Sequence, residues 1–110
     1  PSTSDSGIIF RKHVEKKVIE IKASYKNVKS TKLCTLLSDP QGNSVSTVEH
    51  ILSALYAFEI DNIYIDIDSN EIPVYDGSSL EFVKKISSAG IIEQDSHKKF
   101  IKIKKSIYIR

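Results

Sequence analysis

The stretch STVEHILSALYAF, Ser46–Phe58, has the pattern of an amphipathic helix. Apolar residues recur at the i, i+3, i+4, i+7 spacing that lines one face of a helix: Val48, Ile51, Leu52 and Leu55. Ser46 followed three residues later by Glu49 predicts a capping box, in which each side chain bonds the backbone N–H of the other residue. We therefore expect a helix over 46–58 with its apolar stripe against a core.

His50 lies on a different side of this expected helix, roughly 140° from the centre of the apolar stripe. Ala54 and Ala57 share that side, where a solvated helix face usually carries Lys, Glu, Arg or Gln. Small residues permit close approach, so we expect a partner domain or a ligand to cover this face. The alternative interpretation is a partly exposed histidine without a function, beside a glutamate that only caps the helix.

The sequence outward from this helix predicts strands and a second helix. In NIYIDID, residues 62–68, isoleucine alternates with polar residues and tyrosine, as in a half-buried strand. A second capping box, Ser78 with Glu81, predicts a helix over 78–90 that ends at a left-handed Gly90. The other expected strands cover residues 7–10, 16–25, 31–38 and 100–109, with a tight turn over 39–43.

Composition restricts the class of protein. The 110 residues are 40% hydrophobic and 27% charged, which is typical of one small globular domain. No apolar run approaches the roughly 20 residues of a membrane span. A net charge of +2, from 16 basic and 14 acidic residues, does not favour nucleic-acid binding.

The cysteine and histidine content restricts metal and disulfide chemistry. A single cysteine, Cys34, allows no internal disulfide and no cysteine cluster for zinc, which suits a reducing cytoplasm. A catalytic zinc needs about three protein ligands. His13 and His97 lack the i, i+4 partner of a helical zinc motif and are interpreted as surface residues. From spacing alone, the chain holds no complete metal site.

Several stretches resemble the bacterial UDP-3-O-acyl-N-acetylglucosamine deacetylases, and together they cover most of the chain. The most specific are STVEHILSAL (46–55), IDNIYIDID (60–68), EIPVYDGSSLEFV (71–83) and SAGIIEQ (88–94), with KLCTLL (32–37) and KKFIKIKKSIYI (98–109) also similar. The resemblance implies a cytoplasmic zinc enzyme that removes an acetyl group from UDP-3-O-acyl-N-acetylglucosamine, the committed step of lipid A synthesis. It also implies two related domains with the active site between them.

The fold expected from pattern and resemblance together is α+β. It is a β-α-α-β-type sandwich, in which two helices pack on a mixed or antiparallel sheet, similar to the second domain of a small-subunit ribosomal protein. Residues 1–97 correspond to the first domain of the deacetylase without its N-terminal strands. Residues 98–110 correspond to the last strand and the start of the connection to a second domain.

The resemblance also implies roles for particular residues. His50 matches a zinc ligand, and Glu49 matches the general base that activates the water bound by zinc. The other ligands are expected in the second domain, so we expect this chain alone to be inactive and its uncovered face to favour self-association. Leu33, Cys34 and Thr35 are expected to line the substrate passage, with a small core residue as the alternative for Cys34.

The segment EIPVYDGSS receives a structural interpretation. Asp76 matches an acidic position of the family, but Asp-Gly-Ser before a helix is typical of a turn. Glu71 and Pro73 are likewise interpreted as loop residues near the cleft.

The competing hypothesis is a non-catalytic α+β binding module for RNA or protein. Its binding surface would be the basic strand 98–105, through Lys98, Lys99, Lys102 and Lys104. Alternating Lys and Ile there is also what the solvated face of a strand shows. Because the chain lacks the aromatic stacking pair of an RNA-binding motif, the deacetylase hypothesis is favoured.

Overall fold

A computed structural model describes residues 2–98, 102, 104–106 and 109 of the chain. The first sheet is mixed, with the strand order β2-β1-β6: β1 (Ile8–Val14), β2 (Lys17–Lys22) and β6 (Ile63–Ile67). β1 runs antiparallel to β2 and parallel to β6, and Phe10 on β1 is in register with both Ile21 and Ile65. One face of all three strands packs on the core, through Ile8, Phe10, Ile19, Ile21, Ile65 and Ile67.

The second sheet is antiparallel, with the order β3-β4-β5. A short 3-10 helix, η1 (Tyr25–Asn27), leads into β3 (Val28–Ser30), and β4 (Leu36–Ser38) and β5 (Ser44–Ser46) follow. The strand predicted over 31–38 is correct only from Leu36 onward, because residues 31–35 form the loop between β3 and β4. The predicted turn over 39–43 is confirmed: the Asp39 carboxylate accepts hydrogen bonds from the backbone N–H groups of Gln41 (3.0 Å) and Asn43 (2.8 Å).

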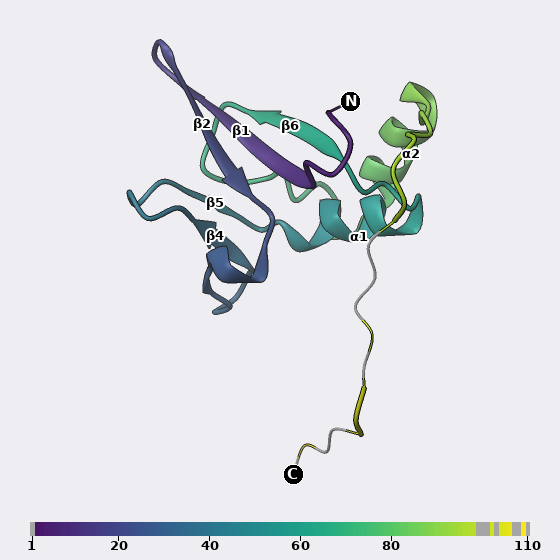
Figure 1. The fold of residues 1–110 in the computed structure, drawn as a ribbon. Helices are drawn as coiled ribbons and strands as arrows, with labels where there is room; N and C mark the ends of the chain where they lie inside the picture. The colour runs from purple at the N-terminus through teal and green to yellow at the C-terminus, as the bar shows by residue number, and fades with distance from the viewer. Residues whose placement is uncertain (1, 99–101, 103, 107–108, 110) are drawn as a thin grey trace.

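Both predicted helices are present, α1 (Glu49–Ala57) and α2 (Leu80–Ala89), and they contact each other. Figure 1 shows the first sheet above α1, with α2 on one side of α1 and the second sheet on the other. Two helices on mixed and antiparallel sheets confirm the α+β class. Gly90 at the end of α2 has the predicted positive φ, 82°.

The predicted capping boxes are wrong. Helix α1 begins after Val48 and α2 after Ser79, and neither N-cap makes a side-chain capping hydrogen bond. Ser46 instead belongs to β5, where its N–H donates to the backbone oxygen of Asn70 (2.8 Å). Ser46, which the local pattern assigned to the start of α1, therefore pairs within a strand instead.

One core joins both sheets and both helices. Its buried residues come from nearly every element: Phe10, Ile21, Leu37, Val45, Val48, Ala54, Ile72 and Phe82. The predicted stripe of α1 is confirmed, since Val48 and Leu55 are buried and Ile51 and Leu52 are partly buried against the core. In the described part of the chain, no helix combines the length and the apolar character needed to cross a membrane.

The prediction that the Ala54–Ala57 side of α1 is uncovered is only half right. Ala54 is 1% exposed and belongs to the core, whereas Ala57 is exposed. The chain's own packing already covers the first of the two alanines. Half of the strand predicted over 100–109 lies outside the described residues, and the described residues of that range, 102, 104–106 and 109, are not in a strand.

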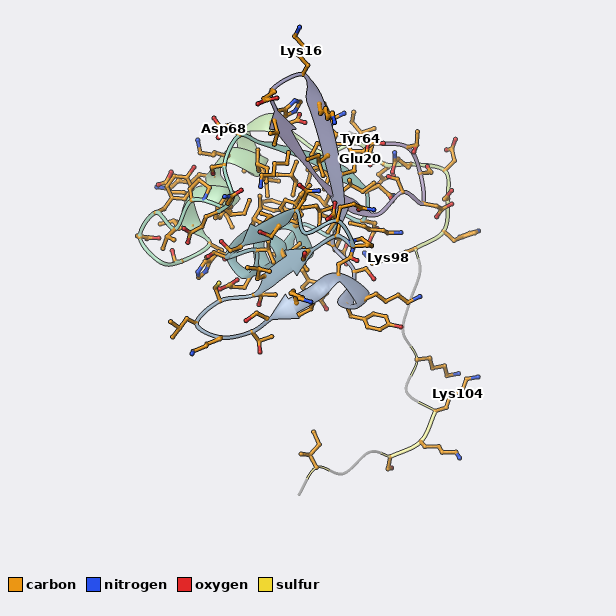
Figure 2. All side chains as sticks on the ribbon, turned by 90° about the vertical axis from the view of Figure 1, so that its left-hand side faces the viewer. Lys16, Glu20, Tyr64, Asp68, Lys98 and Lys104 are labelled. Atoms are coloured by element: carbon orange, nitrogen blue, oxygen red, sulfur yellow. The ribbon has the colours of Figure 1, made fainter. Side chains whose placement is uncertain are left out.

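The outer face of the first sheet carries the polar residues of the alternating pattern. Arg11 donates two hydrogen bonds to Asp66 (2.8 and 3.0 Å), and its guanidinium lies 4.3 Å from the centre of the Tyr64 ring. The Arg11 hydrogen bonds hold the pKa of Asp66 below its usual 3.8, and His13, 3.0 Å away, acts in the same direction. Figure 2 shows Lys16 at the tip of the β1–β2 turn and Lys104 apart from both sheets.

Candidate functional site

Glu49 and His50 are the first two residues of α1, and both side chains are half-buried. Only Thr47 and Val48 separate this helix from β5. Val48 is fully buried and anchors the connection in the core. Thr47 has φ 60°, a left-handed conformation that a β-branched residue rarely adopts and that costs of order 1–3 kcal/mol. The chain therefore enters α1 through a sharp, strained turn.

The loop before β4 holds this turn from one side. The Thr35 backbone N–H donates to Glu49 Oε2 (3.2 Å), and the Thr35 backbone oxygen accepts a hydrogen bond from the Thr47 N–H (3.0 Å). The Glu49 carboxylate is thus fixed by a neighbouring loop and not by its own helix. Among the hydrogen bonds of the described residues, none involves its second oxygen, Oε1.

The segment 70–72 holds the turn from the other side. The Ile72 N–H donates to the Ser46 oxygen (3.1 Å), and Ser46 and Glu71 form a parallel β-bridge. The Thr47 hydroxyl, in a residue only 7% exposed, donates to the Glu71 carboxylate (2.9 Å). Sequence reasoning missed this contact, because no local pattern reveals a positive φ at a threonine. The available signal was the interpretation of Glu71 and Pro73 as loop residues near the active site that the resemblance implies.

Ser79, just before α2, is hydrogen-bonded to the first turn of α1. The Ser79 hydroxyl donates to the backbone oxygen of His50 (2.8 Å). Asp76, just upstream, accepts hydrogen bonds from the Ser78 hydroxyl (2.7 Å) and the Ser78 N–H (3.0 Å), which lower the pKa of Asp76. This local contact matches the structural role predicted for Asp76.

The structure brings together some of the predicted site residues. Thr35, Glu49 and His50 lie together, with Thr35 acting through its backbone. Leu33 is 99% exposed, at a loop position with φ 65°. Cys34 is half-buried and does not belong to the core cluster, which argues against the alternative of a small core residue.

Glu49 and His50 do not by themselves make a complete metal site. An imidazole and a carboxylate on adjacent residues can supply one metal ligand and a base beside it. Within the residues that the structure describes, no group of three His, Cys, Asp or Glu side chains lies close enough to hold a metal ion. Any metal bound by His50 would therefore need further ligands from outside the described residues.

Comparison with known proteins identifies the family to which the chain belongs. The sequence pattern of the family UDP-3-O-acyl N-acetylglycosamine deacetylase (LpxC) matches residues 1–110. Similar curated proteins, all called UDP-3-O-acyl-N-acetylglucosamine deacetylase, include those of Thioalkalivibrio sulfidiphilus, 46% identical over 110 residues, and Colwellia psychrerythraea, 48% identical over 109 residues. The protein of Francisella tularensis is 43% identical over 111 residues.

These alignments cover 99–100% of the chain but only 36–39% of each relative. The chain therefore spans little more than a third of the length of the curated relatives it matches. The family match over residues 1–110 decides the family. The chain belongs to the UDP-3-O-acyl N-acetylglycosamine deacetylase family.

Proposed function

We propose that this chain is the part of a zinc-dependent UDP-3-O-acyl-N-acetylglucosamine deacetylase that carries the general base, Glu49, and one metal ligand, His50. Residues 1–97 would form the first domain, and residues 98–110 would lead to a second domain with the other ligands. The observation that carries the proposal is the hydrogen bond between Thr35 N–H and Glu49 Oε2 (3.2 Å). It fixes a carboxylate, with one oxygen left for proton transfer, beside a half-buried imidazole.

Each residue would have a distinct task in hydrolysis of the acetamide. Glu49 would take the proton of the attacking water through Oε1, while Thr35 keeps the carboxylate oriented. His50 would hold the metal through a ring nitrogen, with its backbone fixed to α2 by Ser79. Zinc, when bound, would polarise the carbonyl and lower the pKa of a bound water. The water oxygen would bond to the acetyl carbon, the C–N bond would break, and the amine nitrogen would take up the proton held by Glu49, so that acetate and the free amine leave.

Substrate binding and cellular location complete the proposal. The half-buried Cys34 and Thr35 and the exposed Leu33 would line the passage for UDP-3-O-acyl-N-acetylglucosamine. The reaction would take place in the cytoplasm as a step of lipid A synthesis.

Substitutions in the full-length protein test the two central residues. Glu49→Gln should lower kcat by about 10²–10⁴-fold without loss of bound zinc, because it removes only the proton acceptor. His50→Ala should lower both zinc content and activity, since it removes a ligand. Glu59→Gln, at an exposed position after α1, is the matched control and should keep wild-type kinetics. Wild-type kcat in Glu49→Gln would contradict the assignment of the base.

A further inference from the structure

We propose that Glu71 is a positioning residue: its carboxylate holds Thr47 in the left-handed turn that directs Glu49 and His50 out of β5. The expected effect of Glu71 on turnover rests on the proposed function, whereas its support of the turn at Thr47 does not. Glu71 has no place in the chemistry assigned above, and its side chain reaches the site through Thr47 alone in the described contacts. Its effect on the reaction is therefore indirect.

The first step is the conformation of Thr47. At φ 60° its Cβ, branched with a methyl and a hydroxyl, crowds the backbone, so this residue relaxes to negative φ unless its surroundings oppose it. Its N–H is held by the Thr35 oxygen (3.0 Å), and its hydroxyl is held by Glu71 Oε1 (2.9 Å). The backbone contact is open to any residue type, whereas the second contact needs the hydroxyl and the carboxylate.

The second step is the rigidity of the support. Glu71 lies between Asn70, whose oxygen accepts from the Ser46 N–H (2.8 Å), and Ile72, whose N–H donates to the Ser46 oxygen (3.1 Å). Ile72 is 1% exposed and belongs to the core. The Glu71 backbone is thus fixed on both sides, and its exposed side chain reaches a hydroxyl in a residue that is 7% exposed.

The third step connects Thr47 to the base. Thr47 bonds the Thr35 oxygen while Glu49 bonds the Thr35 N–H, so a change in the turn at Thr47 moves Glu49 relative to Thr35. Loss of the Glu71 contact leaves a buried hydroxyl without its partner and removes a restraint on φ. The result is a base that is present but misplaced, which reduces turnover more than substrate binding.

Two matched pairs of variants in the full-length protein separate the contact from general packing. Glu71→Leu and Thr47→Val remove the hydrogen bond, whereas Glu71→Gln and Thr47→Ser keep an acceptor oxygen or a hydroxyl. The disruptive variants should lower kcat about 10- to 100-fold with KM within about 2-fold of wild type. The conservative variants should stay within about 3-fold of wild-type kcat.

Hydrogen exchange of the same proteins, followed by mass spectrometry at single-amide resolution, supplies a readout independent of activity. In the disruptive variants the amides of Thr35 and Thr47 should exchange at least about 10-fold faster, while core amides such as Phe10 keep wild-type rates. A uniform rise in exchange across the core, with kcat and KM lost together, would show a merely structural role and overturn the inference.

The two proposals fail in distinguishable ways. A wild-type full-length protein that does not deacetylate the substrate refutes the proposed function, while the exchange experiment still decides whether Glu71 holds the turn. Wild-type exchange at Thr35 and Thr47 in Glu71→Leu refutes the positioning role whatever the activity. If Glu71→Leu does not fold, the Thr47→Val and Thr47→Ser pair decides the question by the same two measurements.

Discussion

Ser79 connects the starts of the two helices through a single side chain. Its hydroxyl donates to the backbone oxygen of His50 (2.8 Å) in a partly buried setting. The first turn of α1 is thus attached to α2 as well as to the loop at Thr35. The sequence pattern did not single out Ser79, whose side chain links the two helices.

Ser79→Ala should lower the free energy of unfolding by about 1 kcal/mol, because it removes one partly buried hydrogen bond. Urea denaturation followed by circular dichroism measures the difference. Ser87→Ala, at an exposed position of α2, is the control and should change stability by less than about 0.5 kcal/mol. Equal stability of the two variants would contradict the importance of the contact to His50.

Asp39 provides a test of pH dependence. The Asn43 side chain, together with backbone N–H groups in the turn, donates to its carboxylate and lowers the pKa of Asp39 from 3.8. Stability contributed by this carboxylate is therefore present above the unfolded-state pKa, near 3.8, and is lost as the pH falls through the lower folded-state pKa. An NMR titration should give an Asp39 midpoint below 3.8.

The matching variant is Asn43→Ala, which removes the largest cause of the shift. Its Asp39 midpoint should move upward, toward the ordinary value. An Asp39 midpoint unchanged by this substitution would show that the Asn43 contact does not form in solution.

At the scale of elements, α2 is attached mainly by one aromatic side chain. Phe82 is the one buried residue of α2, at 7% exposed. The Phe82 ring packs edge-on against the Tyr75 ring, with 5.2 Å between the ring centres. Val83 and Ile86 pack less completely around it. Because α2 carries Ser79 to His50, the position of this helix also affects the candidate site.

Phe82→Ala should lower the free energy of unfolding by about 3–5 kcal/mol, since it leaves a cavity between α2 and the core. That is a large part of the roughly 5–15 kcal/mol typical of a domain. Thermal or urea unfolding measures it, with Tyr56→Ala as the control on α1, where the side chain is 86% exposed. A loss below about 1 kcal/mol for Phe82→Ala would contradict the central role of this ring.

At the scale of the whole molecule, the charges of the C-terminal region bear on the competing RNA-binding hypothesis. Lys98 forms an ion pair with Asp61 (2.7 Å), and this hydrogen bond raises the pKa of Lys98. A lysine engaged with a carboxylate contributes less to phosphate binding than an unpaired one. Figure 2 shows Lys98 and Lys104 well separated, so these two charges do not form one compact patch.

The isolated 110-residue chain should not catalyse deacetylation, even with zinc added. His50 supplies one ligand, and in the described ranges no cluster of three His, Cys, Asp or Glu side chains completes a site. A turnover assay of the chain with UDP-3-O-acyl-N-acetylglucosamine, beside the full-length protein as a positive control, measures this. Clear zinc-dependent turnover by the chain alone would contradict the shared-site proposal.

Much of the pattern of buried faces could be predicted from the amino-acid sequence. Period-two alternation in β2 and β6, and the stripe of α1, follow from the local geometry of strands and helices, so they could be predicted without knowledge of the packing partners. The Glu49–His50 pair was also accessible, because its neighbours form a specific run of residues. Apolar period is a local property, and the stripe of α1 is confirmed by the burial of Val48 and Leu55; the roles of Glu49 and His50 stay predictions.

The hydrogen bonds around the start of α1 could not be predicted from the sequence, because they join residues that are far apart along the chain. Ser46 pairs with Asn70, Glu49 with Thr35, and Thr47 with Glu71, across separations of 14 to 24 residues. Local pattern favoured capping boxes, but strand pairing and loop contacts satisfied the same polar groups from a distance. A short polar side chain has several nearly equivalent hydrogen-bond partners, and only the packed core decides which of them comes within reach.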